Sequence, residues 1–221
     1  VNVRTVACSY GYTLQDLDAA AMANRPLPSW KAEAAARACE QRLDALLFAG
    51  DANAGLVGFN GLAGITDEAL PTENWIAGAA TPAQIMADVN DLINTGINAQ
   101  VDQEEWEFDS ILFPSLQFEH MNRTIVGVDN ASNDTILKVL QKNNPSITFA
   151  KWNRLTTAGA GAATRAIAYK KSNLVVQGHI PREMTPLAPQ LDGMEYVIYC
   201  YARIGGVENP YPLAIRWADG I

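Results

Sequence analysis

A long amphipathic helix, predicted over residues 30–49, is the feature that most constrains the fold. Apolar residues recur at every third or fourth position and so fall on one side of this helix, while most charged residues fall on the other. Ser29 begins the helix and Gly50 ends it. The apolar stripe is narrow and rich in alanine, and it consists of Ala35, Ala36, Cys39, Leu43, Leu46 and Leu47. Such a stripe suits close packing against a sheet, and we expect Cys39, Leu43 and Leu47 to be buried against strands drawn partly from residues 164–204.

A shorter helix is predicted over residues 14–23. Thr13 can cap its first turn, and Asp16 is the acidic partner of a capping box. The prolines within residues 25–28 stop it. Upstream, residues 1–7 alternate as a strand and residues 10–12 predict a corner into the helix. Because the sequence opens with valine inside a strand pattern, we expect that an amino-terminal part was cleaved or is not included.

Strand and helix patterns alternate from about residue 61 to 155, which predicts a mixed α/β layer. Thr81, Pro82 and Gln84 form a good helix start, followed by an apolar stripe. Residues 110–113 read as a buried strand that Pro114 ends. Residues 132–134 are expected to cap a further helix, and residues 147–150 are again strand-like. Beyond this layer the sequence is rich in β patterns, at residues 164–170, 173–180, 194–204 and 211–217.

Composition excludes several classes of function. With 221 residues, 48% of them hydrophobic, the chain can bury a sizeable core. Its formal net charge of -8 and pI near 4.7 disfavour binding to nucleic acid, which needs clustered lysine and arginine. No apolar run reaches the length of a membrane span, and no signal peptide is visible. The sequence therefore indicates a globular protein that binds neither DNA nor a membrane by its charge or hydrophobicity.

The three cysteines, Cys8, Cys39 and Cys200, are far apart in the sequence. No pair has the spacing of metal ligands. We interpret them as reduced, structural residues without a redox role.

Two acidic segments were weighed as metal sites. The glycine-rich residues 51–61 resemble a calcium loop but lack the closing acidic ligand, so a chain reversal is the better interpretation. Residues 102–109 hold five carboxylates, Asp102, Glu104, Glu105, Glu107 and Asp109, in alternation with Trp106 and Phe108. This pattern favours a solvated or interfacial strand edge over a metal or acid–base site.

No motif predicts catalysis. His120 and His179 stand on different segments, without a neighbouring Cys or second His, and no nucleophile elbow is present. Residues 156–163 contain Gly-Ala-Gly but precede a strand pattern and lack the third glycine of a dinucleotide loop, which indicates a flexible loop. Asparagine sequons at Asn122, Asn130 and Asn133 are attributed to chance. We expect no catalytic, cofactor-binding or metal-binding residue, and no cofactor.

Several segments, taken in order, resemble the major capsid proteins of tailed phages and prophages. The resemblance covers nearly the whole chain, and it rests on the order of structural turns and stripes rather than on any single motif. Its segments are residues 10–17, the long helix, 48–51, 55–60, 111–114, 139–145 and 203–207, with Pro210, Pro212 and residues 219–221.

The resemblance implies an α+β protein with the HK97-like capsid fold. It implies a peripheral domain with a spine helix over residues 1–60, an axial α/β domain over 61–163, return strands of the peripheral domain over 164–204, and a final strand over 205–221 back to the axial domain. Members of the family carry an arm and an extended loop before the spine helix, and this sequence begins after both. We therefore expect the 221-residue form to fold but to be monomeric or weakly associated.

The same resemblance implies a structural, non-enzymatic subunit of an icosahedral head, located in the virion and in the host cytoplasm during assembly. Its partners would be further copies in hexamers and pentamers, with scaffolding, portal or decoration proteins, around DNA that is enclosed without sequence-specific binding. Two alternatives stay open at this point. An encapsulin-type cage would share the fold and enclose a cargo protein, and an α/β enzyme would require polar groups that converge in a deep cleft.

Overall fold

The computed structural model describes residues 2–24, 29–72, 74–78, 80–98, 107–127 and 134–221. It divides into two compact units. Unit 1 comprises residues 1–62 and 177–208, and unit 2 comprises residues 63–176 and 209–221. Residues 25–28, the upstream acidic residues 102–105, and Asn130 and Asn133 lie outside the described residues. None of the helices in the described ranges is both long and apolar enough to cross a bilayer.

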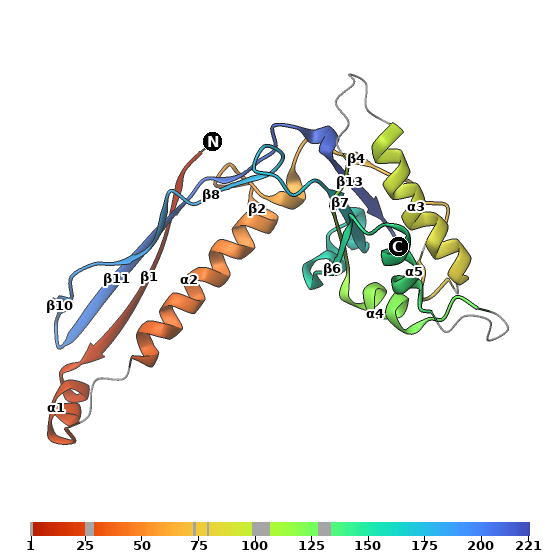
Figure 1. The fold of residues 1–221 in the computed structure, drawn as a ribbon. Helices are drawn as coiled ribbons and strands as arrows, with labels where there is room; N and C mark the ends of the chain where they lie inside the picture. Colours follow the sequence, from red (N-terminus) through yellow and green to blue (C-terminus); the bar gives the residue numbers. More distant parts are fainter. Residues whose placement is uncertain (1, 25–28, 73, 79, 99–106, 128–133) are drawn as a thin grey trace. The chain divides into compact units, whose positions relative to one another are not determined.

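Unit 1 is a long helix packed on a twisted antiparallel sheet (Figure 1). Strand β1 pairs with β11 along its whole length, from Arg4 opposite Ile204 to Thr13 opposite Glu195. Strands β9 and β10 pair with the other edge of β11. The elements of unit 1 are β1 (Arg4–Thr13), α1 (Leu14–Met22), α2 (Trp30–Ala49), β2 (Gly50–Asp51), β3 (Leu56–Val57), η1 (Phe59–Gly61), β8 (Gln177–His179), β9 (Arg182–Pro186), β10 (Gln190–Asp192), β11 (Glu195–Ile204) and β12 (Gly206–Glu208).

Helix α2 has the bounds predicted from the sequence and packs its apolar stripe on the sheet. Cys39, Leu43 and Leu46 are buried, whereas Leu47 is only half-buried. They meet Ala202 and Ile204 of β11, and Val6, Cys8 and Met184 lie against the same core. The prediction that strands from the carboxy-terminal part pack against this helix is confirmed.

The helix ends at Gly50 for a steric reason. Gly50 has a φ of 73°, and a Cβ there would lie 2.5 Å from the amide nitrogen of Gly58. A side chain is excluded because the β2–β3 hairpin closes against this point. The predicted stop at Gly50 is thus confirmed. Ser29, by contrast, makes no capping bond to the backbone, and its hydroxyl bonds to Glu33 instead.

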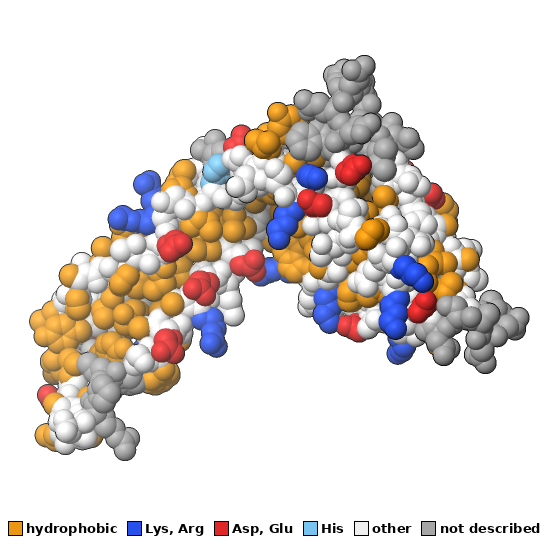
Figure 2. Space-filling view, viewed as in Figure 1, with side chains coloured by type: hydrophobic (Ala, Val, Ile, Leu, Met, Phe, Trp, Pro, Cys, Tyr) orange, Lys and Arg blue, Asp and Glu red, His pale blue; other side chains and the backbone are white. Residues whose placement is uncertain are grey.

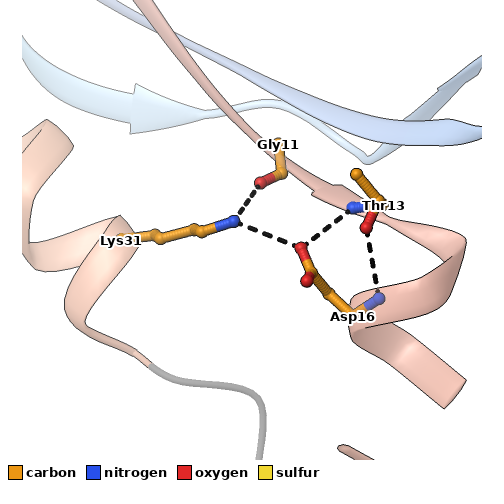
Figure 3. A network of polar contacts seen from close by, with 4 residues as sticks. All are labelled: Gly11, Thr13, Asp16 and Lys31. Carbon is orange, nitrogen blue, oxygen red and sulfur yellow. Dashed lines mark hydrogen bonds and ion pairs between the residues drawn. The ribbon is translucent and has the colours of Figure 1, made fainter. Parts of the chain in front are cut away.

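A polar network joins α1, α2 and β1 (Figure 3). The amide of Asp16 donates to Thr13 Oγ1, and the amide of Thr13 donates to Asp16 Oδ2, which completes the predicted capping box. Lys31 Nζ donates to the carbonyl of Gly11 at 3.0 Å and to Asp16 Oδ2 at 3.4 Å. The bonds from Thr13, with a smaller contribution from Lys31, lower the pKa of Asp16. The start of α2 is therefore tied to the end of β1.

Unit 2 is a five-stranded sheet in the order β4-β13-β7-β5-β6, with α3, α4 and α5 around it (Figure 1). The pairs β13/β4 and β5/β6 are parallel, and β13/β7 and β5/β7 are antiparallel. The core joins α3, α4 and α5 to the sheet through Ile85, Met121, Leu140 and Ile111. Its elements are β4 (Thr66–Asp67), α3 (Pro82–Asn98), β5 (Ser110–Phe113), α4 (Ser115–Arg123), α5 (Ile136–Asn143), β6 (Thr148–Lys151), η2 (Asn153–Thr157), η3 (Ala160–Ala162), β7 (Arg165–Tyr169), η4 (Pro212–Ala214) and β13 (Ile215–Asp219).

The start of α3 agrees with the sequence, and the start of α5 does not. Gln84 Oε1 accepts from the amide of Thr81, and Thr81 Oγ1 accepts from the amide of Gln84. At α5 the cap is Thr135, whose hydroxyl accepts from the amide of Lys138, rather than residues 132–134. Four consecutive polar residues, 132–135, precede this helix, and each is a residue type that can cap a helix, so the sequence alone does not show which one does so.

Three expected boundaries differ from those of the structure. The corner predicted at residues 10–12 is wrong, because β1 stays extended through Thr13 where β11 pairs with it. Gly11 leaves room for Glu195, whose Oε1 would lie 2.2 Å from a Cβ at this position. The return strands expected over residues 164–204 begin later, because β7 pairs with β13 and β5 in the sheet of unit 2. The final segment divides at residue 208, since β12 still pairs with β8 in unit 1.

Candidate functional site

The open face of the unit 1 sheet is the first candidate surface. Side chains alternate between the two faces of a strand, and in β11 Cys200, Ala202 and Ile204 face α2. The residues between them face away, and Tyr199 among them is 42% exposed. On β1 the corresponding residues are small and exposed, namely Thr5, Ala7 and Ser9. This face therefore combines small side chains on β1 with aromatic side chains on β11, and it also carries Arg203 and, over the ring of Tyr201, Arg182.

Exposed apolar residues continue at the hairpin between β10 and β11. Met194 in its turn is 74% exposed, and Leu191 is also exposed. The amide of Leu14 donates to the carbonyl of Met194, so α1 lies beside this hairpin, and Met22 at the end of α1 is exposed. Figure 2 shows hydrophobic side chains gathered over unit 1, with single acidic side chains among them. Grouped exposed apolar residues of this kind mark protein contact surfaces.

A groove of about 520 Å³ beside α2 is the second candidate surface. Its apolar lining comes from the half-buried side of α2 and from the segment that leads into β9, and it consists of Ala36, Leu43, Leu47, Ile180 and Met184. Glu40, Asp44 and Glu183 supply carboxylates at the same groove. An apolar lining with acidic groups suits a protein segment that carries apolar and basic side chains.

The two histidines considered for catalysis belong to different units. His179 lies in unit 1, where its Nε2 is 3.2 Å from Oε2 of exposed Glu208, and His120 lies on α4 in unit 2. The Gly-Ala-Gly segment forms a short turn in which Gly161 has a φ of 65°. This loop is anchored rather than free, because the amide of Ala160 donates to Asp219 Oδ2 at 2.8 Å.

The acidic segments have structural roles where they are described. Asp51 Oδ1 accepts from the amides of Asn53 and Ala54, so it shapes the β2–β3 turn as a chain reversal. Asp109 Oδ1 accepts from Ser110 Oγ and from the amide of Lys171, which fixes the start of β5. Among the described residues, no three His, Cys, Asp or Glu side chains are arranged to hold a metal ion.

The strongest electrostatic feature is a buried ion pair in unit 2. Arg165 Nε and Nη2 donate to Asp219 Oδ1 and Oδ2 at 2.6 and 2.7 Å. The guanidinium also lies 3.9 Å from the ring centroid of Trp217. Burial alone would raise the pKa of Asp219, but the bonds from Arg165 and Ala160 and the charge of Arg165 lower it. Burial and the nearby Asp219 raise the pKa of Asp67. Both carboxylate oxygens of Asp219 accept hydrogen bonds from within unit 2, so this ion pair acts as a structural clamp.

Neither the groove nor the open sheet face was predicted from the sequence. Glu40 and Asp44 are one turn apart on α2, but the residues opposite them come from 180–184. Only the pairing of β1, β9 and β11 brings these segments together. The one local signal was the narrowness of the α2 stripe, which indicated that a single sheet face would be covered.

A family model described as major capsid protein matches residues 1–221. No curated protein sequence matches the chain. Among solved structures, the capsid of Myoviridae phage XM1 aligns with a TM-score of 0.79 at 20% identity, over 99% of this chain and 74% of that chain. The capsid of the native GTA particle aligns with a TM-score of 0.66 at 15% identity, over 98% of this chain and 72% of that chain.

An encapsulin is similar to a lesser degree. The holo-SrpI encapsulin complex from Synechococcus elongatus aligns with a TM-score of 0.52 at 8% identity, over 99% of this chain and 74% of that chain. At such identities a structural likeness shows a shared fold.

Proposed function

The chain belongs to the major capsid protein family, and from this membership we propose how its two units build a shell. It is a structural subunit of a phage capsid with the HK97-like fold, as its family and its structural neighbours agree. Its place is therefore the virion. We propose that unit 1 is the peripheral domain, with α2 as its spine helix, and that unit 2 is the axial domain, which meets other copies around five-fold and six-fold axes.

The observation that carries the proposed contacts is the exposure of apolar side chains on unit 1. Tyr199, Leu191 and Met194 are exposed in the isolated chain, and burial of apolar area is the main favourable contribution to association. In a closed shell the contacts are heterologous, so one surface of each copy meets a different surface of its neighbour. The open sheet face and the groove beside α2 are two such unlike surfaces.

The role proposed for the DNA follows from charge. A net charge of -8 disfavours binding of the subunit to the phosphate backbone of DNA. The shell would therefore enclose DNA without sequence-specific binding. Assembly would take place in the host cytoplasm, with scaffolding, portal or decoration proteins as further partners. The subunit would perform no catalysis: His179 bonds to Glu208, Asp51 and Asp109 shape the local backbone, and the groove beside α2 is lined by apolar and acidic side chains without a histidine or cysteine.

An encapsulin-type cage is the alternative. It is favoured less, because the encapsulin aligns with a TM-score of 0.52 and the phage capsid with 0.79.

The test combines a charge on the open face with a matched control. The full-length product, with any scaffolding partner supplied, would carry Tyr199→Asp on β11, or Gln141→Asp on an exposed position of α5 in unit 2. Both changes add one negative charge at the surface. We expect closed particles from the unchanged protein and from Gln141→Asp, and only small species from Tyr199→Asp, although its unfolding midpoint is retained.

Light scattering and negative-stain images give the readout. Normal particles from Tyr199→Asp would reject the open face as a contact. Unchanged protein that never exceeds a dimer, across several salt and pH conditions, would reject the shell proposal itself.

A further inference from the structure

The three cysteines that are far apart in sequence meet beneath α2. Cys8 on β1 is the register partner of Cys200 on β11. Cys8 Sγ also reaches the carbonyl of Ala35 at 3.9 Å, and Cys39 lies one helical turn after Ala35 on the same face of α2. Cys8 is also close enough to the thiols of Cys39 and Cys200 to raise the pKa of both. The cluster therefore joins the first strand, the long helix and the last long strand of unit 1.

The three thiols differ in exposure. Cys39 and Cys200 are buried, and Cys8 is half-buried. Cys8 is consequently the thiol that a small solute meets first.

We propose that Cys8 and Cys200 form a disulfide when the folded subunit meets a low-molecular-weight disulfide, and that Cys39 stays a thiol. Opposite residues of antiparallel strands have Cα atoms about 4.5 to 5.5 Å apart. This separation falls within the range of about 4.4 to 6.8 Å that a disulfide spans. The two side chains also project to the same side of the sheet, because they are register partners, so the two sulfur atoms can approach each other directly.

The chemistry is two thiol–disulfide exchanges. The thiolate of Cys8 attacks one sulfur of glutathione disulfide, which forms a mixed disulfide on Cys8 and releases one glutathione thiolate. The thiolate of Cys200 then attacks the Cys8 sulfur and expels the second glutathione. In total two cysteine thiols are oxidised, one glutathione disulfide is reduced to two glutathione molecules, and the two protons pass to the thiolates that leave.

Burial supports this order of steps. It raises the pKa of the Cys39 and Cys200 thiols, and the nearby Cys8 raises both further. Thiols of this kind react slowly with a solute. Cys200 therefore reacts only in the second step, when the mixed disulfide of Cys8 and glutathione lies beside it.

The cross-link would fasten β1 to β11 at the middle of their pairing. These strands are far apart in the sequence, so the bond closes a long loop that contains residues 63–176 of unit 2. Closure of a long loop restricts the unfolded chain most. A subunit that passes from a reducing to an oxidising medium would thereby gain resistance to unfolding. This inference does not depend on the proposed shell contacts, because all three residues lie within unit 1.

Peptide mapping tests the assignment directly. Cleavage after lysine and arginine, except before proline, puts Cys8 in residues 5–31, Cys39 in 38–42 and Cys200 in 183–203. The folded protein would be incubated with glutathione disulfide, alkylated in denaturant and digested without reduction. We expect peptide 5–31 linked to 183–203, with Cys39 alkylated, and an unfolding midpoint about 5 °C higher that a reductant reverses.

Two variants separate the possible partners. Cys39→Ala should keep the link, and Cys200→Ala should leave glutathione on Cys8. A link between 5–31 and 38–42, a link between two copies, or alkylation of all three cysteines would overturn the proposal. The protein without substitutions identifies the partner of Cys8 even if a variant fails to fold, because each possible pair of linked peptides has a different mass.

Discussion

Arg165 and Asp219 are joined by two hydrogen bonds, at 2.6 and 2.7 Å, with side chains only 8% and 11% exposed. They connect β7 to the end of β13 and, through Ala160, to the turn before β7. A buried pair of this geometry is costly to break, because removal of one partner leaves a charge without compensation.

The first prediction concerns this pair. Arg165→Met should lower the free energy of unfolding by about 3 to 5 kcal/mol, since Asp219 would keep its burial and lose its counter-charge. Lys151→Met is the matched control, because Lys151 Nζ also lies 2.6 Å from Glu119 but both side chains are more than half exposed. Lys151→Met should lower the free energy of unfolding by at most about 1 kcal/mol. Urea unfolding measures both changes, and equal losses would contradict the role given to burial.

The second prediction is the pH dependence of Asp219→Asn. The pKa of Asp219 is lowered in the folded protein, so its ionised form contributes stability that is present above the ordinary value of about 3.9. That contribution is lost as the pH falls through the lower, folded pKa. The stability difference between wild type and Asp219→Asn should therefore be full at pH 6 and shrink below pH 4. If the stability difference between wild type and Asp219→Asn instead grew as the pH fell, it would contradict the lowered pKa of Asp219.

The third prediction concerns Asp88, a buried carboxyl on α3 whose Oδ2 accepts from Trp75 Nε1 at 2.9 Å. Burial raises its pKa, although the bonds from Trp75 and Thr72 oppose this. Its charge thus opposes folding at neutral pH, and stability is gained as the pH falls through the raised pKa. Asp88→Asn keeps an acceptor for Trp75 and should be at least as stable as wild type at pH 7.

Asp88→Ala is the comparison for that experiment. It leaves Trp75 Nε1 without this acceptor and should cost about 1 to 3 kcal/mol. Urea unfolding at pH 7 and pH 4 separates charge from hydrogen bonding, because the advantage of Asp88→Asn should narrow at the lower pH. If Asp88→Asn greatly lowered the free energy of unfolding at pH 7, the ionised form of Asp88 would be shown to stabilise the fold.

The fourth prediction concerns Gly206, between β11 and β12. Its φ is 79°, and a Cβ would lie 2.5 Å from the carbonyl oxygen of Val57. Gly206→Ala should destabilise unit 1 by about 2 kcal/mol or more, from backbone strain and the clash together. Gly61→Ala is the control, since Gly61 has open space around its Cβ position. Thermal unfolding compares the two, and a similar midpoint for both would contradict the steric argument.

Local sequence determined the features that depend on neighbouring residues. The capping boxes of Thr13 with Asp16 and of Thr81 with Gln84, and the length of α2, were predicted because residues three or four apart decide them. The order of segments also carried the resemblance to capsid proteins. The local patterns alone did not supply that resemblance, because each of them occurs in many folds.

Tertiary structure decided what depends on pairing across the chain. β1 continues through Thr13, where a corner was expected, because β11 offers it hydrogen-bond partners from nearly two hundred residues later. The same register places Cys8 opposite Cys200, and the β9 pairing brings Glu183 to the groove beside Glu40. A one-residue change of register would turn each of these side chains to the other face of the sheet. The helices were therefore readable from the sequence, whereas the surfaces and the thiol cluster exist only through strand pairing.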